Sequence, residues 1–153
     1  MKNIKSKKAF TMIELVFTIV VIGILASVAI PRMAATRDDA EITKARITVA
    51  SIRNALSMER QKRILRGNFA TITTVGGTNT GVFGHFDDNS SDSAVLEYAI
   101  SSSTDKGKWE YKLSDGEKQY IFHGMSDVIF LVNASGKFVC KDITSHGCKQ
   151  LTE

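Results

Sequence analysis

The sequence is poor in residues that interrupt helices and in residues that carry out catalysis. It has one proline, Pro31, and no glycine or proline between residues 32 and 66. Its three histidines lie far apart and outside any nucleophile motif, and it has no phosphate-binding glycine loop. Because catalysis needs reactive groups that converge in one pocket, we predict that the protein is not an enzyme. The stretch without helix breakers predicts a long helix.

Charged residues are missing from residues 10–30, apart from one carboxylate, Glu14. At ~1.5 Å per residue, a helix of this length is about as long as the hydrocarbon core of a bilayer is thick. Four lysines lie directly before it, at positions 2, 5, 7 and 8. Lysines beside a hydrophobic span stay on the cytoplasmic side. We therefore predict a single membrane span with a cytoplasmic N-terminus and an exported remainder.

Glu14 needs a partner in such a span, because a carboxylate there costs at least ~2.5 kcal/mol. No basic residue lies between Phe10 and Pro31. A cut before Phe10 would create an α-ammonium one helical turn from Glu14. The sequence therefore predicts that Glu14 pairs with such an ammonium, in its own chain or in a neighbouring one.

Residues 7–15, KKAFTMIEL, resemble the processing site of type IV prepilins and type II secretion pseudopilins. The resemblance implies that a prepilin peptidase cuts between Ala9 and Phe10 and that Phe10 becomes N-methylphenylalanine. Glu14 is then the fifth mature residue and Pro31 the twenty-second, where this family has Glu and often Pro. Ala9 departs from the glycine that usually precedes the cut. The family also implies roles in assembly for Glu14 and Pro31.

The resemblance favours a structural subunit of a type II secretion pseudopilus, in the bacterial inner membrane and then in a filament that spans the periplasm. Its implied partners are copies of itself, other pseudopilins, prepilin peptidase and an inner-membrane assembly platform. A DNA-uptake pilus of competence and a type IV pilus are the alternatives within the family. Outside it, residues 27–29 (Ser-Val-Ala) suit an ordinary secretory cut that releases a soluble periplasmic binding domain, and a plain membrane anchor is also open.

The pattern beyond Pro31 predicts one helix over residues 10–66 with a kink near the proline, ending at Gly67-Asn68. An apolar stripe recurs on one face of this helix. Alternating residues and turns predict strands over 109–113, 119–123, 127–132 and 137–140, a long loop over 70–93, and a short helix or strand over 94–100. The stripe consists of Ile42, Ala45, Val49, Ile52 and Leu56.

Together these patterns predict an α+β, pilin-like fold, in which the long N-terminal helix packs on a small antiparallel sheet. A coiled coil with another chain is the alternative cover for the stripe. The expected parts are a leader peptide (1–9), a transmembrane assembly helix (10–31), an amphipathic stem helix (32–66) and a C-terminal periplasmic domain (67–153).

Charge is divided along the chain. Residues 32–66 carry a net charge of +5, and residues 67–153 carry −4. This split predicts weak electrostatic contact between copies. The arginines of the basic part form either a solvated face or a surface for DNA phosphates, anionic lipids or acidic neighbours. The DNA candidates are Arg46, Arg53, Arg60 and Arg63.

Two sets of residues are candidates for a disulfide or a metal. In an exported chain, Cys140 and Cys148 predict a disulfide, and a metal site with His123 and His146 is the alternative. An oxygen-rich cluster is either a solvated turn or a weak calcium candidate, since it lacks the spacing of an EF-hand. The cluster consists of Asp87, Asp88, Asn89 and Asp92.

Overall fold

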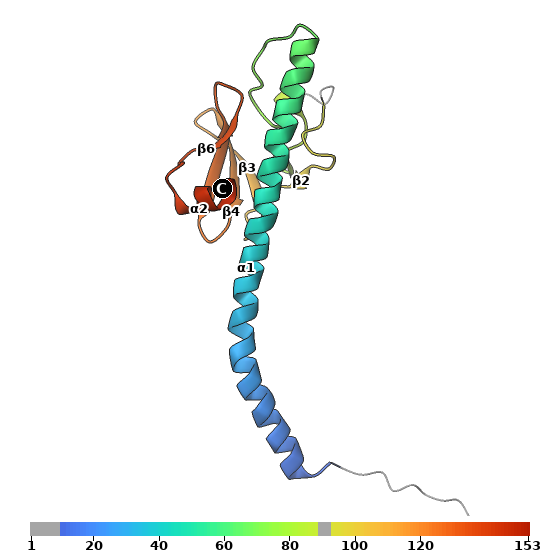
Figure 1. Ribbon diagram of the computed structural model, residues 1–153, viewed down its shortest axis with the longest axis vertical. Coiled ribbons are helices and arrows are strands. Elements are labelled where there is room, and N and C mark those ends of the chain that lie inside the picture. The colour runs from blue at the N-terminus through green and yellow to red at the C-terminus, as the bar shows by residue number, and fades with distance from the viewer. Residues whose placement is uncertain (1–9, 89–92) are drawn as a thin grey trace, which may run out of the picture. The chain divides into compact units, whose positions relative to one another are not determined.

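The computed structural model describes residues 10–88 and 93–153, and for residues 31, 32, 34, 35 and 88 it describes the backbone alone (Figure 1). The chain divides into two compact units with the boundary between Arg37 and Asp38. One helix, α1 (Met12–Leu65), runs through that boundary. Every other described helix and strand belongs to the second unit.

Helix α1 begins two residues after the predicted start and ends one residue before the predicted end. Its end has a clear cause. Gly67 adopts a left-handed conformation with φ of 78°. The N–H of Gly67 donates to the carbonyl of Ile64, and the N–H of Asn68 donates to the carbonyl of Arg63. This pair of bonds satisfies carbonyls that the last turn would otherwise leave free, so the predicted stop at Gly67-Asn68 is confirmed.

The second unit contains a four-stranded sheet in the order β3-β4-β5-β6, with every neighbouring pair antiparallel. Tyr111 lies opposite Tyr120, and Ile121 lies opposite Ile129. The predicted meander and the α+β, pilin-like fold are therefore confirmed. The strands are β3 (Trp109–Ser114), β4 (Glu117–His123), β5 (Asp127–Val132) and β6 (Phe138–Cys140).

The apolar stripe of α1 and the aromatic face of the sheet form one core, and Figure 1 shows the sheet beside the helix. The ring of Phe83 lies 5.1 Å from that of Trp109 and 5.3 Å from that of Tyr120. Stripe and sheet thus cover each other, as predicted. The stripe buries Ala45, Val49, Ile52 and Leu56 against Trp109, Tyr120, Phe122, Phe130 and Phe138.

The predicted long loop over 70–93 is in large part a buried layer. It contains β1 (Gly81–Val82), which pairs with β2 (Ile100–Ser101), and a 3-10 turn at Phe86–Asp88. Of the predicted helix or strand over 94–100, Ile100 alone lies in a strand, so that prediction was wrong for the rest. The side chains of this layer that are almost fully buried are Ile72, Thr74, Val75, Val82, Phe83 and Phe86.

Gly77 lets this layer approach the sheet, and Gly76 lets two parts of the layer approach each other. A Cβ on Gly76 would lie 2.3 Å from the carbonyl oxygen of His85, and a Cβ on Gly77 would lie 2.2 Å from a ring carbon of Tyr111. Phe83, which is fully buried, has a positive φ of 62°, a strained conformation for a bulky residue. Its aromatic contacts hold it there. The sequence shows these glycines as a turn, but their role is close packing.

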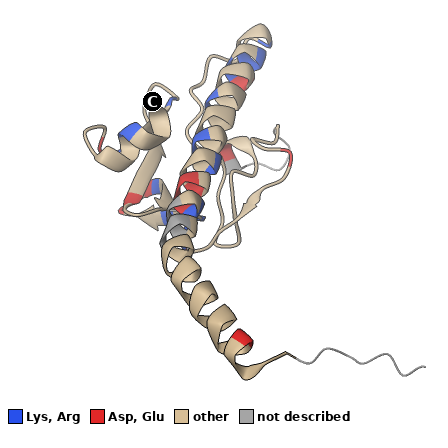
Figure 2. Ribbon diagram, turned by 60° about the horizontal axis from the view of Figure 1, so that its bottom comes forward, with Lys and Arg blue, Asp and Glu red and all other residues tan. Residues whose placement is uncertain are grey.

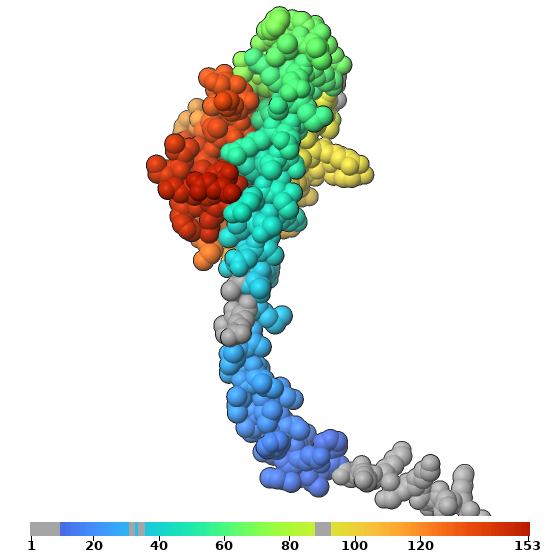
Figure 3. Space-filling view, in the orientation of Figure 1, coloured from blue at the N-terminus to red at the C-terminus, as the bar shows by residue number. Residues whose placement is uncertain are grey.

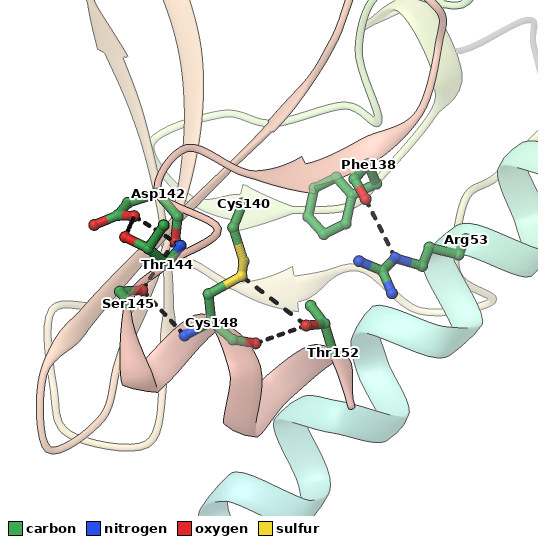
Figure 4. The surroundings of a disulfide bond; sticks show 8 residues. All are labelled: Arg53, Phe138, Cys140, Asp142, Thr144, Ser145, Cys148 and Thr152. Carbon is green, nitrogen blue, oxygen red and sulfur yellow. Dashed lines mark hydrogen bonds between the residues drawn. A yellow bond between two sulfur atoms is a disulfide. The ribbon is translucent and has the colours of Figure 1, made fainter.

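The chain ends in a short helix, α2 (His146–Thr152), that the sequence analysis did not predict. Ser145 caps it by accepting a hydrogen bond from the N–H of Cys148. The predicted disulfide between Cys140 and Cys148 is present and ties α2 to β6 (Figure 4). Seven residues with one glycine carry too short a pattern for the helix to be recognised, and the covalent tie supplies what the local sequence lacks.

Replacing both cysteines by alanine should lower the free energy of unfolding by about 2–3 kcal/mol, because the disulfide restricts the unfolded chain. The measurement is denaturant unfolding of the detergent-solubilised protein. Wild-type protein under reducing conditions is the matched control and should unfold at the same denaturant concentration as the variant. A double variant as stable as the oxidised wild type would contradict this role.

A buried ion-pair cluster ties the end of α1 to the buried layer that precedes the sheet. The Nε of Arg63 lies 3.1 Å from Oε1 of Glu59, and its Nη1 lies 2.6 Å from Oδ2 of Asp87. The other oxygen of Asp87 accepts hydrogen bonds from the N–H and the hydroxyl of Thr73. Burial by itself would raise the pKa of Glu59 and Asp87, but these hydrogen bonds and the neighbouring positive charge outweigh it and lower both pKa values.

Arg63→Met should therefore cost about 3 kcal/mol of unfolding free energy near neutral pH, because it leaves two carboxylates without their buried partner. Arg66→Met is the control, since Arg66 is exposed and should change stability by less than about 0.5 kcal/mol. Both variants are compared with the wild type by denaturant unfolding.

The same cluster predicts a pH dependence. Because the pKa values of Glu59 and Asp87 are lowered on folding, their contribution is present above the unfolded values of roughly 4 and is lost as the pH falls through the folded values. The stability difference between wild type and Arg63→Met should shrink below that pH. A difference that stays constant down to strong acid would show that the cluster is not coupled to titration.

Candidate functional site

The first turn of α1 holds the residues on which the predicted processing and assembly site depends. The carbonyl of Thr11 accepts a bond from the N–H of Leu15, and its hydroxyl accepts one from the N–H of Glu14 at 3.3 Å. Thr11 is thus the N-cap, and Glu14 is the third helical residue. A carboxylate in a first turn also lies favourably in the field of the helix dipole.

The sequence itself carries a signal for this arrangement. Thr11 and Glu14 have the Thr-x-x-Glu spacing of a capping box, in which the cap and the third residue satisfy the first backbone groups of a helix. That spacing would have set the start of the helix at Met12 rather than Phe10. The structure shows one half of this pattern, in which the hydroxyl of Thr11 accepts from the N–H of Glu14.

Phe10 lies just outside the helix, and its side chain is 74% exposed. The predicted cut between Ala9 and Phe10 therefore falls where the described chain is not yet helical. Ala9 itself lies outside the described residues, so the cut between Ala9 and Phe10 stays a prediction. N-methylation of Phe10 likewise stays a prediction.

Residues Met12–Ile30 are long and apolar enough to cross a membrane, and none of this window is buried in the structure. Figure 2 shows the stretch as uncharged ribbon apart from one acidic position, while charged residues gather further along α1. Apolar surface of this extent is unfavourable in water and requires lipid or other apolar helices around it.

The hydroxyl groups in this window bond to the helix itself. Thr18 donates to the carbonyl of Leu15 at 2.8 Å, and Ser27 donates to the carbonyl of Ile24 at 2.7 Å. Such internal bonds let polar side chains enter an apolar environment without an outside partner. Glu14 is thus the one charged group that an apolar surrounding would have to accommodate.

Helix α1 is continuous through Pro31, where a kink was predicted. The structure describes only the backbone at this position. The assembly role of Pro31 therefore stays a prediction, as does the kink.

The four arginines considered for DNA are engaged within the second unit. Arg63 is buried in the ion-pair cluster, so the expectation that it is exposed was wrong. Arg46 donates twice to the carbonyl of Gln150, at 3.0 and 2.6 Å. Their shared role is to attach α1 to the rest of the unit. The remaining two are Arg53, which donates to Phe138, and Arg60, which donates to Ala70.

The structure describes only part of the candidate calcium cluster. Both oxygens of Asp87 are occupied by Arg63 and Thr73, so this carboxylate already has a structural role. Asn89 and Asp92 lie outside the described residues, and for Asp88 the backbone alone is described. Within residues 10–88 and 93–153, no group of three or more histidine, cysteine, aspartate or glutamate side chains is arranged so that it could hold a metal ion. Calcium binding remains an untested prediction.

The alternative metal site of cysteine and histidine does not form. Both sulfurs are joined in the disulfide and cannot bind a metal as thiolates. The imidazole of His123 instead lies 2.9 Å from a carboxylate oxygen of Asp127 and 3.1 Å from one of Glu110. This contact fastens the ends of β3, β4 and β5 to one another.

Comparison with known proteins agrees with this site. The prokaryotic N-terminal methylation motif matches residues 4–30. The type II secretion system core protein G of Vibrio cholerae is 33% identical over 58 residues, which cover 38% of this chain and 40% of that protein. The type IV narrow pilus major component PilA5 of Thermus thermophilus is 41% identical over 51 residues, which cover 33% of this chain and 44% of that protein.

The alignments thus cover less than half the length of either relative. No solved structure matches the chain. The motif covers Lys5, Lys7, Lys8, Phe10 and Glu14, and helix α1, which begins within this stretch, packs on an antiparallel sheet in the second unit. On these grounds the N-terminal part of the chain carries the prokaryotic N-terminal methylation motif and is similar to that of type IV pilins and type II secretion pseudopilins.

Proposed function

We propose that the protein is a structural subunit of a type II secretion pseudopilus. The observation that carries the proposal is the apolar surface of Met12–Ile30, which is exposed and holds one carboxylate. Lipid covers this surface while the subunit waits in the inner membrane, and the same segments of other copies cover it in the filament. The similarity to the core protein G of Vibrio cholerae supports the choice of filament.

Processing and assembly follow from the same residues. A prepilin peptidase cuts before Phe10 and methylates its nitrogen, and an inner-membrane platform then lifts the subunit into the filament. Glu14 of one copy pairs with the ammonium of Phe10 in the next, which sets the register between them. A buried carboxylate without a partner is costly, so the unpaired register is disfavoured. The role is structural rather than catalytic.

A type IV pilus is the second candidate, because the relative in Thermus thermophilus is a pilus component. The DNA-uptake alternative has less support. It relied on four arginines exposed to phosphates, but Arg63 is buried in the ion-pair cluster, and Arg46, Arg53 and Arg60 each use part of their guanidinium donors within the protein.

The mature N-terminus tests the processing step. We expect intact-mass and N-terminal analysis of the protein from its own cells to find N-methylated Phe10 as the first residue. A start at Ile30 would mean a secretory cut after Ala29. That result would replace the filament subunit by a soluble exported domain.

Replacing Glu14 by leucine tests the register. Membrane insertion should be unchanged, because the span becomes more apolar, while the amount of filament should fall by at least roughly tenfold, since the opposed ammonium loses its partner. Thr18→Val is the matched control, because Thr18 bonds to its own helix and should be replaceable. Filament yield is measured by shearing and immunoblotting. Filaments at normal yield from Glu14→Leu would overturn this role.

A further inference from the structure

A groove runs between α1 and the outer edge of the sheet in the second unit. It has a volume of about 470 Å³ and lies between the α1 segment 53–60 and the segment 135–139, which includes the first two residues of β6. Leu56 and Phe138, both buried, form its apolar floor. Pockets of this size hold a drug-sized molecule, so one aromatic side chain with a neighbour fits easily. We call this feature the stem groove.

The rim of the stem groove is cationic. Arg53, Arg60 and Lys137 line it, and none of its lining residues, all of which the structure describes, is acidic. Arg53 donates its Nε–H to the carbonyl of Phe138 (Figure 4), and the other N–H groups of the same guanidinium are further donors. Lys137 is exposed at the end of the groove. The groove therefore suits an aromatic residue next to a carboxylate.

Such a pair projects elsewhere on the same unit. Tyr98 is 80% exposed, and its neighbour Glu97 is exposed as well. The segment is fixed at both ends, because Val95 is buried and donates its N–H to Gly84, and Ile100 pairs with Val82 in β1. We call residues 97–99 the projecting segment. An exposed tyrosine on an anchored base is the kind of residue that dominates protein interfaces.

The two features lie on different sides of the unit. In Figure 3 the yellow part of the chain, which includes the projecting segment, stands out on one side of α1, and the orange and red sheet lies on the other. One copy therefore presents the segment while it offers the groove to another copy. A contact of this kind joins unlike surfaces, and it repeats along a chain of subunits when it does not close into a ring.

We propose that the projecting segment of one copy docks into the stem groove of a second copy. Tyr98 lies on Leu56 and Phe138 with its ring against the guanidinium of Arg53 or Arg60, and Glu97 pairs with the cationic rim. The proposal rests on the proposed function, because it names the contact between the second units of a filament. It also gives a physical purpose to the acidic charge beyond residue 66 and the basic charge of residues 32–66.

The test places p-benzoylphenylalanine at position 98 of the full-length chain in its own cells. After irradiation, the crosslinked peptides are identified by mass spectrometry. Crosslinks to residues 53–60 or 135–139 of a second copy are expected. Crosslinks to another region of the chain, to a different protein or to DNA would overturn the proposal, and so would intact filaments without any crosslink.

Charge reversal gives an independent measure. Glu97→Arg and Lys137→Glu should each lower filament yield roughly tenfold, and the double variant should recover most of it, because the pair is restored with opposite sign. Glu153→Arg and Lys112→Glu reverse exposed charges elsewhere and should leave the yield unchanged. Equal yields from all four single variants would overturn the contact.

Failure of this contact can be distinguished from failure of the proposed function. If wild-type chains start at Phe10 and form filaments while the reversals have no effect, the contact is wrong and the filament subunit stands. If wild-type chains start at Ile30 and form no filament, both fall.

Discussion

The second unit depends on the mutual cover of one helix stripe and one aromatic sheet face. A meander of four strands cannot bury an apolar face by itself, and an amphipathic helix cannot keep its stripe in water. Ala45, Val49, Ile52 and Leu56 meet the rings of the sheet in a single core. The layer before the sheet closes this core from a further side, since Val75, Val82 and Phe83 are fully buried. Removing any of the three parts would expose the others.

The apolar surface of helix α1 is covered in two different ways along its length. Its stripe beyond Arg37 is satisfied within the chain, whereas Met12–Ile30 has no buried residue and must be satisfied from outside. The first half can therefore exchange one apolar surrounding for another, while the second half stays in its core. This division suits the proposed function, in which the subunit is first held in a membrane and later packed among its copies.

The arginines of residues 32–66 also have two roles. Arginines of the stem are fixed to backbone carbonyls and to buried carboxylates, so they act as fasteners between α1 and the segments that pack on it. Around the stem groove, however, arginine donors remain beyond those bonds. The same arginines can thus stabilise the unit and make its surface positively charged around the stem groove.

The sequence by itself determined the apolar span, the length and stop of α1, the stripe, the four strands and the disulfide, because each follows from local periodicity, from a turn residue or from a pair of cysteines. It also held the capping box of Thr11 and Glu14, which went unused. The tertiary structure alone decided the burial of Ile72, Val75, Val82, Phe83 and Phe86, the formation of helix α2 and the partners of the arginines. Their residues lack a local period, and their conformations depend on groups distant in the chain: Tyr111 against Gly77, Asp87 against Arg63, and Arg46 against Gln150 in α2.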